Sequence, residues 1–83
     1  MEQDILDTLN KAIREEHGTR VNIESLWVNA EVDSFGTNMV FMEMDEKYGC
    51  FNNEWFLGRT KEEWMVLPIR EIVERVMNEG TIV

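Results

Sequence analysis

Cysteine, histidine and proline each occur only once in the 83 residues of this chain. Cys50 has no partner for an internal disulfide, so the sequence gives no support for an oxidising compartment. His17 lies far from Cys50 along the chain, so neither a metal-ligand cluster nor a Cys–His nucleophile pair is expected. A glycine-rich phosphate loop is missing as well. We therefore expect no catalytic residues, no metal site and no enzymatic activity.

Long apolar runs are also missing. No run approaches the ~18 residues that would be read as a membrane-spanning helix. The N-terminal segment Met1–Asp4 is acidic and does not resemble a signal peptide. These features predict a cytoplasmic protein without a membrane partner.

Basic residues are scarce, since 8 Lys and Arg stand against 17 Asp and Glu, for a formal net charge of −9. No Lys or Arg occurs between Val21 and Glu46, whereas that stretch holds the acids Glu24, Glu31, Asp33, Glu43, Asp45 and Glu46. Such a surface repels nucleic acid and anionic membranes and attracts basic protein surfaces. We expect partners with basic docking surfaces and no nucleic acid, although acids also serve simply to keep a small protein soluble.

The apolar residues that are present, 43% of the chain with three Trp, suffice for one modest core. Their spacing predicts helices over 4–16, 34–48 and 68–79, and a short helix at 60–65. Residues 19–33 lack a helical period and are expected to form a long loop that is pinned to the core. The chain is therefore predicted to be a monomeric, all-α four-helix bundle. Its third helix is short, and its long loop joins helices one and two.

The helix expected at 34–48 carries two apolar stripes. One side, the core face, gathers Thr37, Val40, Phe41, Met44 and Tyr48. The opposite side carries Phe35, Met39 and Met42, together with the acids Glu43, Asp45 and Glu46. An apolar stripe with a carboxylate rim is typical of a docking surface, and methionine adapts to several partners. The alternative is that the long loop or residues 50–66 cover Phe35 and Met39 as part of the core.

Ser34 stands at the expected start of this helix, directly after Asp33. Serine is a favoured N-cap, so capping alone would explain an isolated serine at this place. A hydroxyl at a helix N-terminus is also well placed to carry a phosphodiester, because the unpaired amides and the helix dipole favour an anion. Asp33 could engage the basic groups of a modifying enzyme.

The segment 33–48, which reads DSFGTNMVFMEMDEKY, resembles the Asp-Ser-Leu segment and second helix of acyl carrier proteins. In that family the serine is followed by leucine, an apolar helix interior, acids near the helix end and a closing aromatic residue. The resemblance extends over 4–79 through the order of helices and loops. It implies a single acyl-carrier-like domain over 1–83 with the four-helix-bundle fold of the family.

The resemblance also implies a cofactor and partners. A phosphopantetheinyl transferase (holo-carrier synthase) would attach 4′-phosphopantetheine from coenzyme A to Ser34. The arm would carry acyl groups as thioesters to acyl-transferring and acyl-modifying enzymes of fatty-acid, lipid or polyketide-type biosynthesis. Partner recognition would involve Asp33, Phe35, Met39, Met42, Glu43, Asp45 and Glu46. Candidates to line a space for the acyl chain are Val40, Met44, Ile72 and Val76.

Several positions depart from the family's pattern. Phe35 replaces the usual leucine, Gly36 and Met39 stand where fatty-acid members carry acids, and Asn38 stands where they carry an aliphatic residue. These departures predict a specialised, stand-alone carrier. Two alternatives remain open, namely an unmodified interaction module in which Ser34 only caps the helix, and an aminoacyl carrier.

Overall fold

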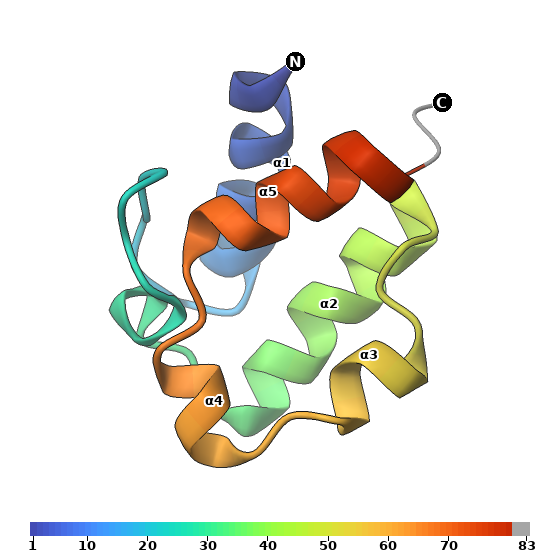
Figure 1. The fold of residues 1–83 in the computed structure, drawn as a ribbon. Helices are drawn as coiled ribbons and strands as arrows, with labels where there is room; N and C mark the ends of the chain where they lie inside the picture. The colour runs from blue at the N-terminus through green and yellow to red at the C-terminus, as the bar shows by residue number, and fades with distance from the viewer. Residues whose placement is uncertain (81–83) are drawn as a thin grey trace.

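The computed structural model describes residues 1–80, which fold into helices joined by loops, with no strand in that range (Figure 1). The elements are α1 (Glu2–Glu15), the 3-10 turn η1 (Trp27–Ala30), α2 (Ser34–Tyr48), α3 (Asn53–Leu57), α4 (Lys61–Met65) and α5 (Ile69–Glu79). The all-α prediction is confirmed. No helix within residues 1–80 combines the length and the apolar character needed to cross a bilayer.

The long helices follow the predicted ranges, and the segment between α2 and α5 does not. Helix α2 begins at Ser34 and ends at Tyr48 as expected, and the next residue, Gly49, adopts the left-handed conformation with a φ of 69°. The single short helix predicted at 60–65 is present as α4, but it is preceded by a second short helix, α3. Helix α3 begins where the Asn52 side chain accepts a hydrogen bond from the Trp55 amide at 2.9 Å. Residues 1–80 therefore contain five α-helices and not four.

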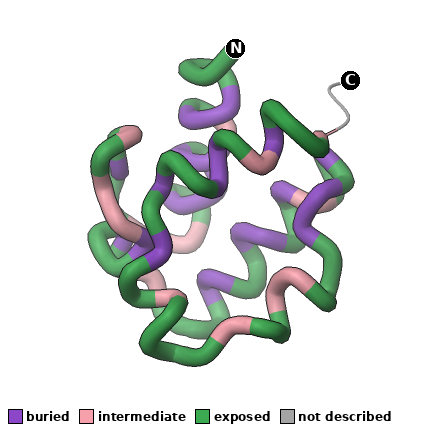
Figure 2. The backbone as a smooth tube through the Cα atoms, viewed as in Figure 1, coloured by how far each residue is buried: buried purple, intermediate pink, exposed green. Residues whose placement is uncertain are grey.

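The core lies between the three long helices. Helix α1 packs against both α2 and α5, and Figure 2 shows buried positions along all three helices. The periodicity of α1 explains this, because Ile5, Leu9 and Ile13 recur at intervals of four and are completely buried. On α5 the same role falls to Ile72 and Val76, which have no exposed surface.

The long loop between α1 and α2 is pinned to the core, as predicted, by buried side chains such as Val21 and Trp27, and hydrogen bonds hold it as well. The buried Asn10 side chain donates to the Val21 carbonyl at 2.9 Å and accepts from the Val21 amide at 2.8 Å. Farther along, the Trp27 amide donates to the Leu67 carbonyl at 2.7 Å. These bonds satisfy both backbone groups of Val21 and fix η1 next to the segment that precedes α5.

Aromatic side chains fill the space beneath α3 and α4. The Phe41 ring on α2 is central to this cluster, with ring centroids 5.0–6.2 Å from those of Trp27, Phe51, Trp55, Phe56 and Trp64. Tilted and edge-on pairs at these separations are favourable beyond the area that they bury. The aromatic-rich segment 50–66 thus closes one end of the core.

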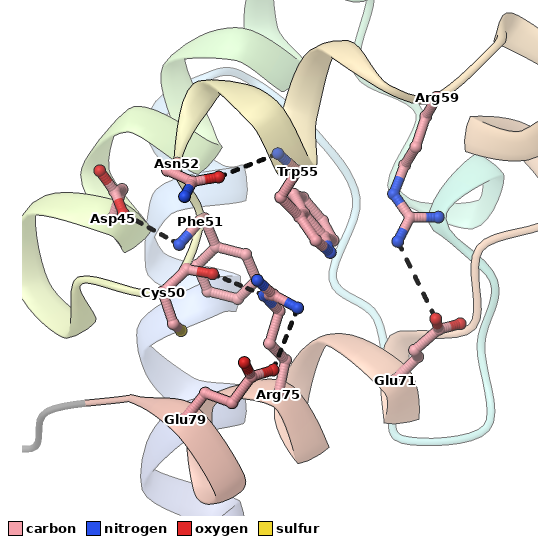
Figure 3. A network of polar contacts seen from close by, with 9 residues as sticks. All are labelled: Asp45, Cys50, Phe51, Asn52, Trp55, Arg59, Glu71, Arg75 and Glu79. Carbon is pink, nitrogen blue, oxygen red and sulfur yellow. Dashed lines mark hydrogen bonds and ion pairs between the residues drawn. The ribbon is translucent and has the colours of Figure 1, made fainter.

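Polar contacts attach the start of that segment to its neighbours (Figure 3). The Arg75 side chain on α5 donates to the Cys50 carbonyl and lies 3.1 Å from the Glu79 carboxylate. Asp45 on α2 accepts a hydrogen bond from the Phe51 amide at 2.9 Å. These contacts hold residues 50 and 51 between the ends of α2 and α5.

Candidate functional site

Asp33, and not Ser34, caps helix α2. Asp33 has an extended backbone, and its carboxylate accepts a hydrogen bond from the Gly36 amide at 2.7 Å. Ser34 is the first helical residue and is exposed. Its hydroxyl has no hydrogen-bond partner within residues 1–80. The capping role expected of an isolated serine at this position therefore belongs to Asp33.

A pocket of about 800 Å³ opens beside Ser34, between η1, the start of α2 and α4. Its lining comprises Trp27, Val28, Glu31, Val32, Asp33, Ser34, Thr37, Phe56, Lys61, Trp64 and Met65. In its wall, the Trp27 indole N–H donates to the Thr37 hydroxyl at 3.0 Å, and both residues are buried. Most of the other lining side chains are aromatic or aliphatic, so the pocket offers an apolar surface next to the accessible Ser34 hydroxyl.

The lining of the pocket also includes charged groups. Glu31 and Asp33 contribute carboxylates, and Lys61 is the one cation among the lining residues of the described chain. Lys61 comes from α4, so the fold brings it to a stretch of sequence that has no base of its own. The site therefore combines an exposed hydroxyl, two carboxylates and one ammonium.

The outer stripe of α2 is exposed to solvent. Phe35 is 68% exposed, Met42 58% and Met39 37%. The alternative that the loop or residues 50–66 cover Phe35 and Met39 is therefore not what the structure shows. Glu43 and Glu46 are exposed beside this stripe. The remaining proposed recognition acid, Asp45, is half-buried and accepts the hydrogen bond from the Phe51 amide described above.

The four candidates for an acyl-chain lining lie elsewhere. Val40, Met44, Ile72 and Val76 have no exposed surface and belong to the packed core. None of them lines the pocket beside Ser34. That pocket uses residues from η1, α3 and α4, which the sequence did not assign to a pocket. The available sequence signal for this region is the concentration of aromatic residues in 50–66.

The other reactive side chains of residues 1–80, Cys50 and His17, lie apart from the pocket. Cys50 is buried, and burial raises the pKa of its thiol, which disfavours the nucleophilic thiolate. His17 is exposed after the end of α1. Within residues 1–80 no group of three or more His, Cys, Asp and Glu side chains could hold a metal ion.

Comparison with models of known families, with curated proteins and with solved structures found no match. A function for this chain must therefore be inferred from the site itself.

Proposed function

We propose that this chain is an acyl carrier protein that carries a 4′-phosphopantetheine arm on Ser34. The observation that supports this most is the state of the Ser34 hydroxyl. It is exposed, it is not needed for capping because Asp33 fills that role, and it lies at the edge of an apolar pocket. A modifying enzyme needs a hydroxyl that it can reach and that no other contact in the fold holds in place.

The arrangement of helices is compatible with the four-helix bundle of that family. Helices α1, α2 and α5 would correspond to its three longer helices. Helices α3 and α4 together would take the place of its short third helix.

The residues around Ser34 fit the proposed group. A phosphodiester on the hydroxyl would lie at the positive end of the 15-residue helix α2. The amides of Ser34 and Phe35 have no acceptor within residues 1–80, since the Asp33 side chain takes only the Gly36 amide. These two amides could face an anion directly.

In the proposed modification, the Ser34 oxygen attacks the phosphorus of coenzyme A that bears the pantetheine. A new O–P bond forms while the P–O bond to the adenosine bisphosphate breaks, and this leaving group takes the bonding electron pair. The transferase supplies the metal ion and the base that removes the hydroxyl proton, because no side chain within residues 1–80 accepts a hydrogen bond from Ser34. When attached, the arm supplies a thiol that carries acyl groups as thioesters.

The chain itself would present the loaded arm to partner enzymes. Docking would use the exposed stripe of Phe35, Met39 and Met42, with Glu43 and Glu46 steering basic surfaces toward it. Tethering would raise the effective concentration of the thioester at each docked enzyme.

The test is incubation of the unmodified protein with coenzyme A and a broad-specificity phosphopantetheinyl transferase, followed by intact mass measurement. A mass gain of one phosphopantetheine is expected for the wild type and for Ser25→Ala, and no gain for Ser34→Ala. Ser25 is a suitable control because it is the only other serine, and its hydroxyl is already bonded to Asn22. Absence of any gain with several transferases would contradict the proposal.

The exposure of Phe35 and Met42 also favours a second candidate, an unmodified interaction module. In that case the α2 stripe would be the whole functional surface and Ser34 would remain unmodified. The same mass measurement separates the two candidates.

A further inference from the structure

We infer that Lys61 binds the phosphodiester of the arm and holds the arm over the pocket beside Ser34, an inference that rests on the proposed function. Lys61 begins helix α4 and lines the same pocket as Ser34, although 26 residues separate the two in the sequence. It is exposed, so its flexible side chain and compact ammonium are available to an anion at the pocket's edge.

The two carboxylates of the pocket are already engaged. Glu31 accepts a hydrogen bond from the Thr19 hydroxyl at 2.7 Å, and Asp33 accepts one from the Gly36 amide at 2.7 Å. In contrast, Lys61 forms no ion pair with any acid in residues 1–80. The pocket therefore holds one cation without a fixed partner.

Two charged side chains near Lys61 in sequence, those of Arg59 and Glu63, interact with groups other than Lys61. The Arg59 guanidinium lies 4.4 Å from the Trp55 ring centroid and 3.9 Å from the Glu71 carboxylate (Figure 3). The Glu63 carboxylate accepts a hydrogen bond from the Thr60 amide at 3.1 Å. Neither Arg59 nor Glu63 is thus positioned to replace or neutralise Lys61 at the pocket.

Packing fixes the place of the Lys61 backbone. The Thr60 hydroxyl accepts from the Glu63 amide at 3.2 Å, which completes a capping box around the first turn of α4. One turn later, the Trp64 ring packs 5.1 Å from Phe41 and 6.2 Å from Trp27. Helix α4 therefore keeps Lys61 at the pocket while the side chain remains free to move.

Modification would make this cation important. A phosphodiester adds a negative charge close to Glu31 and Asp33, and Lys61 is the lining residue that can offset the repulsion. Its attraction would keep the arm along the pocket and would weaken as added salt screens the charges. The apo protein has no such anion and therefore lacks this interaction.

The test compares loaded and unloaded protein for the wild type, Lys61→Gln, Lys61→Arg and Lys11→Gln. Lys11 is the matched control, because it is an exposed lysine on α1 that does not line this pocket. Intact mass first verifies loading, and the thermal unfolding midpoint is then measured for each form. At low salt, we expect Lys61→Gln to lower the unfolding midpoint of the loaded form by about 2–4 °C more than it lowers that of the unloaded form. High salt should remove this difference, and Lys61→Arg and Lys11→Gln should not show it.

The position of the arm gives a second readout. Loading should shift the indole N–H resonances of Trp27 and Trp64 in the wild type, and Lys61→Gln should reduce those shifts. The role of Lys61 would be overturned if loading changed the unfolding midpoint and the indole resonances of Lys61→Gln as much as those of the wild type. The carrier function would then remain intact. A failure of the wild type to load would overturn the proposed function instead.

Discussion

The Asp33 carboxylate accepts a hydrogen bond from the Gly36 amide at 2.7 Å and so begins the helix in which Ser34 is the first residue. The polar side chains of Asp33 and Ser34 are adjacent in sequence, but only one of them is hydrogen-bonded in the described part of the chain. Asp33 uses its oxygen to satisfy a backbone donor, whereas the Ser34 hydroxyl has no partner within residues 1–80. A structural role and a chemical role can be separated by substituting one residue at a time.

We expect Asp33→Ala to lower the free energy of unfolding by about 1 kcal/mol, because the Gly36 amide loses its cap. Ser34→Ala should change it by less than about 0.5 kcal/mol, since an exposed hydroxyl without a partner is removed. Urea unfolding followed by circular dichroism measures both values. Comparable losses for the two variants would show that the Ser34 hydroxyl stabilises the helix after all.

A second prediction compares two methionines on α2. Met42 is 58% exposed and Met44 is completely buried. Met44→Ala should cost about 2–5 kcal/mol because it leaves a cavity in the core, whereas Met42→Ala should cost less than about 0.5 kcal/mol. The free energy of unfolding of each variant tests this. A large loss for Met42→Ala would mean that the outer stripe is packed in solution and is not a free docking surface.

The main helices could be predicted from sequence because their apolar residues recur at helical spacing and their ends carry clear signals. Helix α2 shows this, since Gly49 ends it in the left-handed conformation that glycine adopts readily. Helices α3 and α4 both have five residues, too few to show a period, but the sequence before α3 lacks the capping-box pattern that Thr60 and Glu63 give α4. The only local signal of α3 was Asn52, a favoured cap that occurs equally in turns.

Less of the candidate site could be predicted. The helical spacing of α2 placed Phe35 and Met42 opposite the core face, but it did not decide whether another segment covers Phe35, which the structure shows to be exposed. The pocket depends on contacts between segments distant in sequence, such as Trp27 with Trp64 at 6.2 Å, and local patterns carry no information about them. The sequence also did not decide whether Asp33 or Ser34 caps α2, because both residue types are favoured at the N-cap position.

A third prediction concerns the hydrogen bond in the pocket wall. Thr37→Val keeps the shape of the side chain but leaves the buried Trp27 indole N–H without its acceptor at 3.0 Å. We expect a loss of about 1–3 kcal/mol in the free energy of unfolding. Thr37→Ser is the control, because it removes the methyl group and keeps the hydroxyl acceptor. If Thr37→Val were as stable as the wild type, the indole would have to find water or another acceptor in the pocket.

The last prediction follows from the pKa of Glu63 at the start of α4. The hydrogen bond from the Thr60 amide is the largest of the causes that lower this pKa below its ordinary value of 4.5. A carboxyl whose pKa is lower in the folded state contributes stability above its unfolded pKa and loses it as the pH falls through the folded pKa. Glu63→Gln has no charge to lose in that range.

We therefore expect the thermal midpoint of the wild type, measured relative to Glu63→Gln, to fall as the pH drops below about 4.5. Glu54→Gln is the control, because it removes one exposed carboxylate from the neighbouring helix α3 without altering the capping box. Trp64 follows Glu63 and lines the pocket, so tryptophan fluorescence should report a loosened α4 at the same pH. Parallel pH profiles for the wild type and Glu63→Gln would show that the capping box does not couple the protonation of Glu63 to folding.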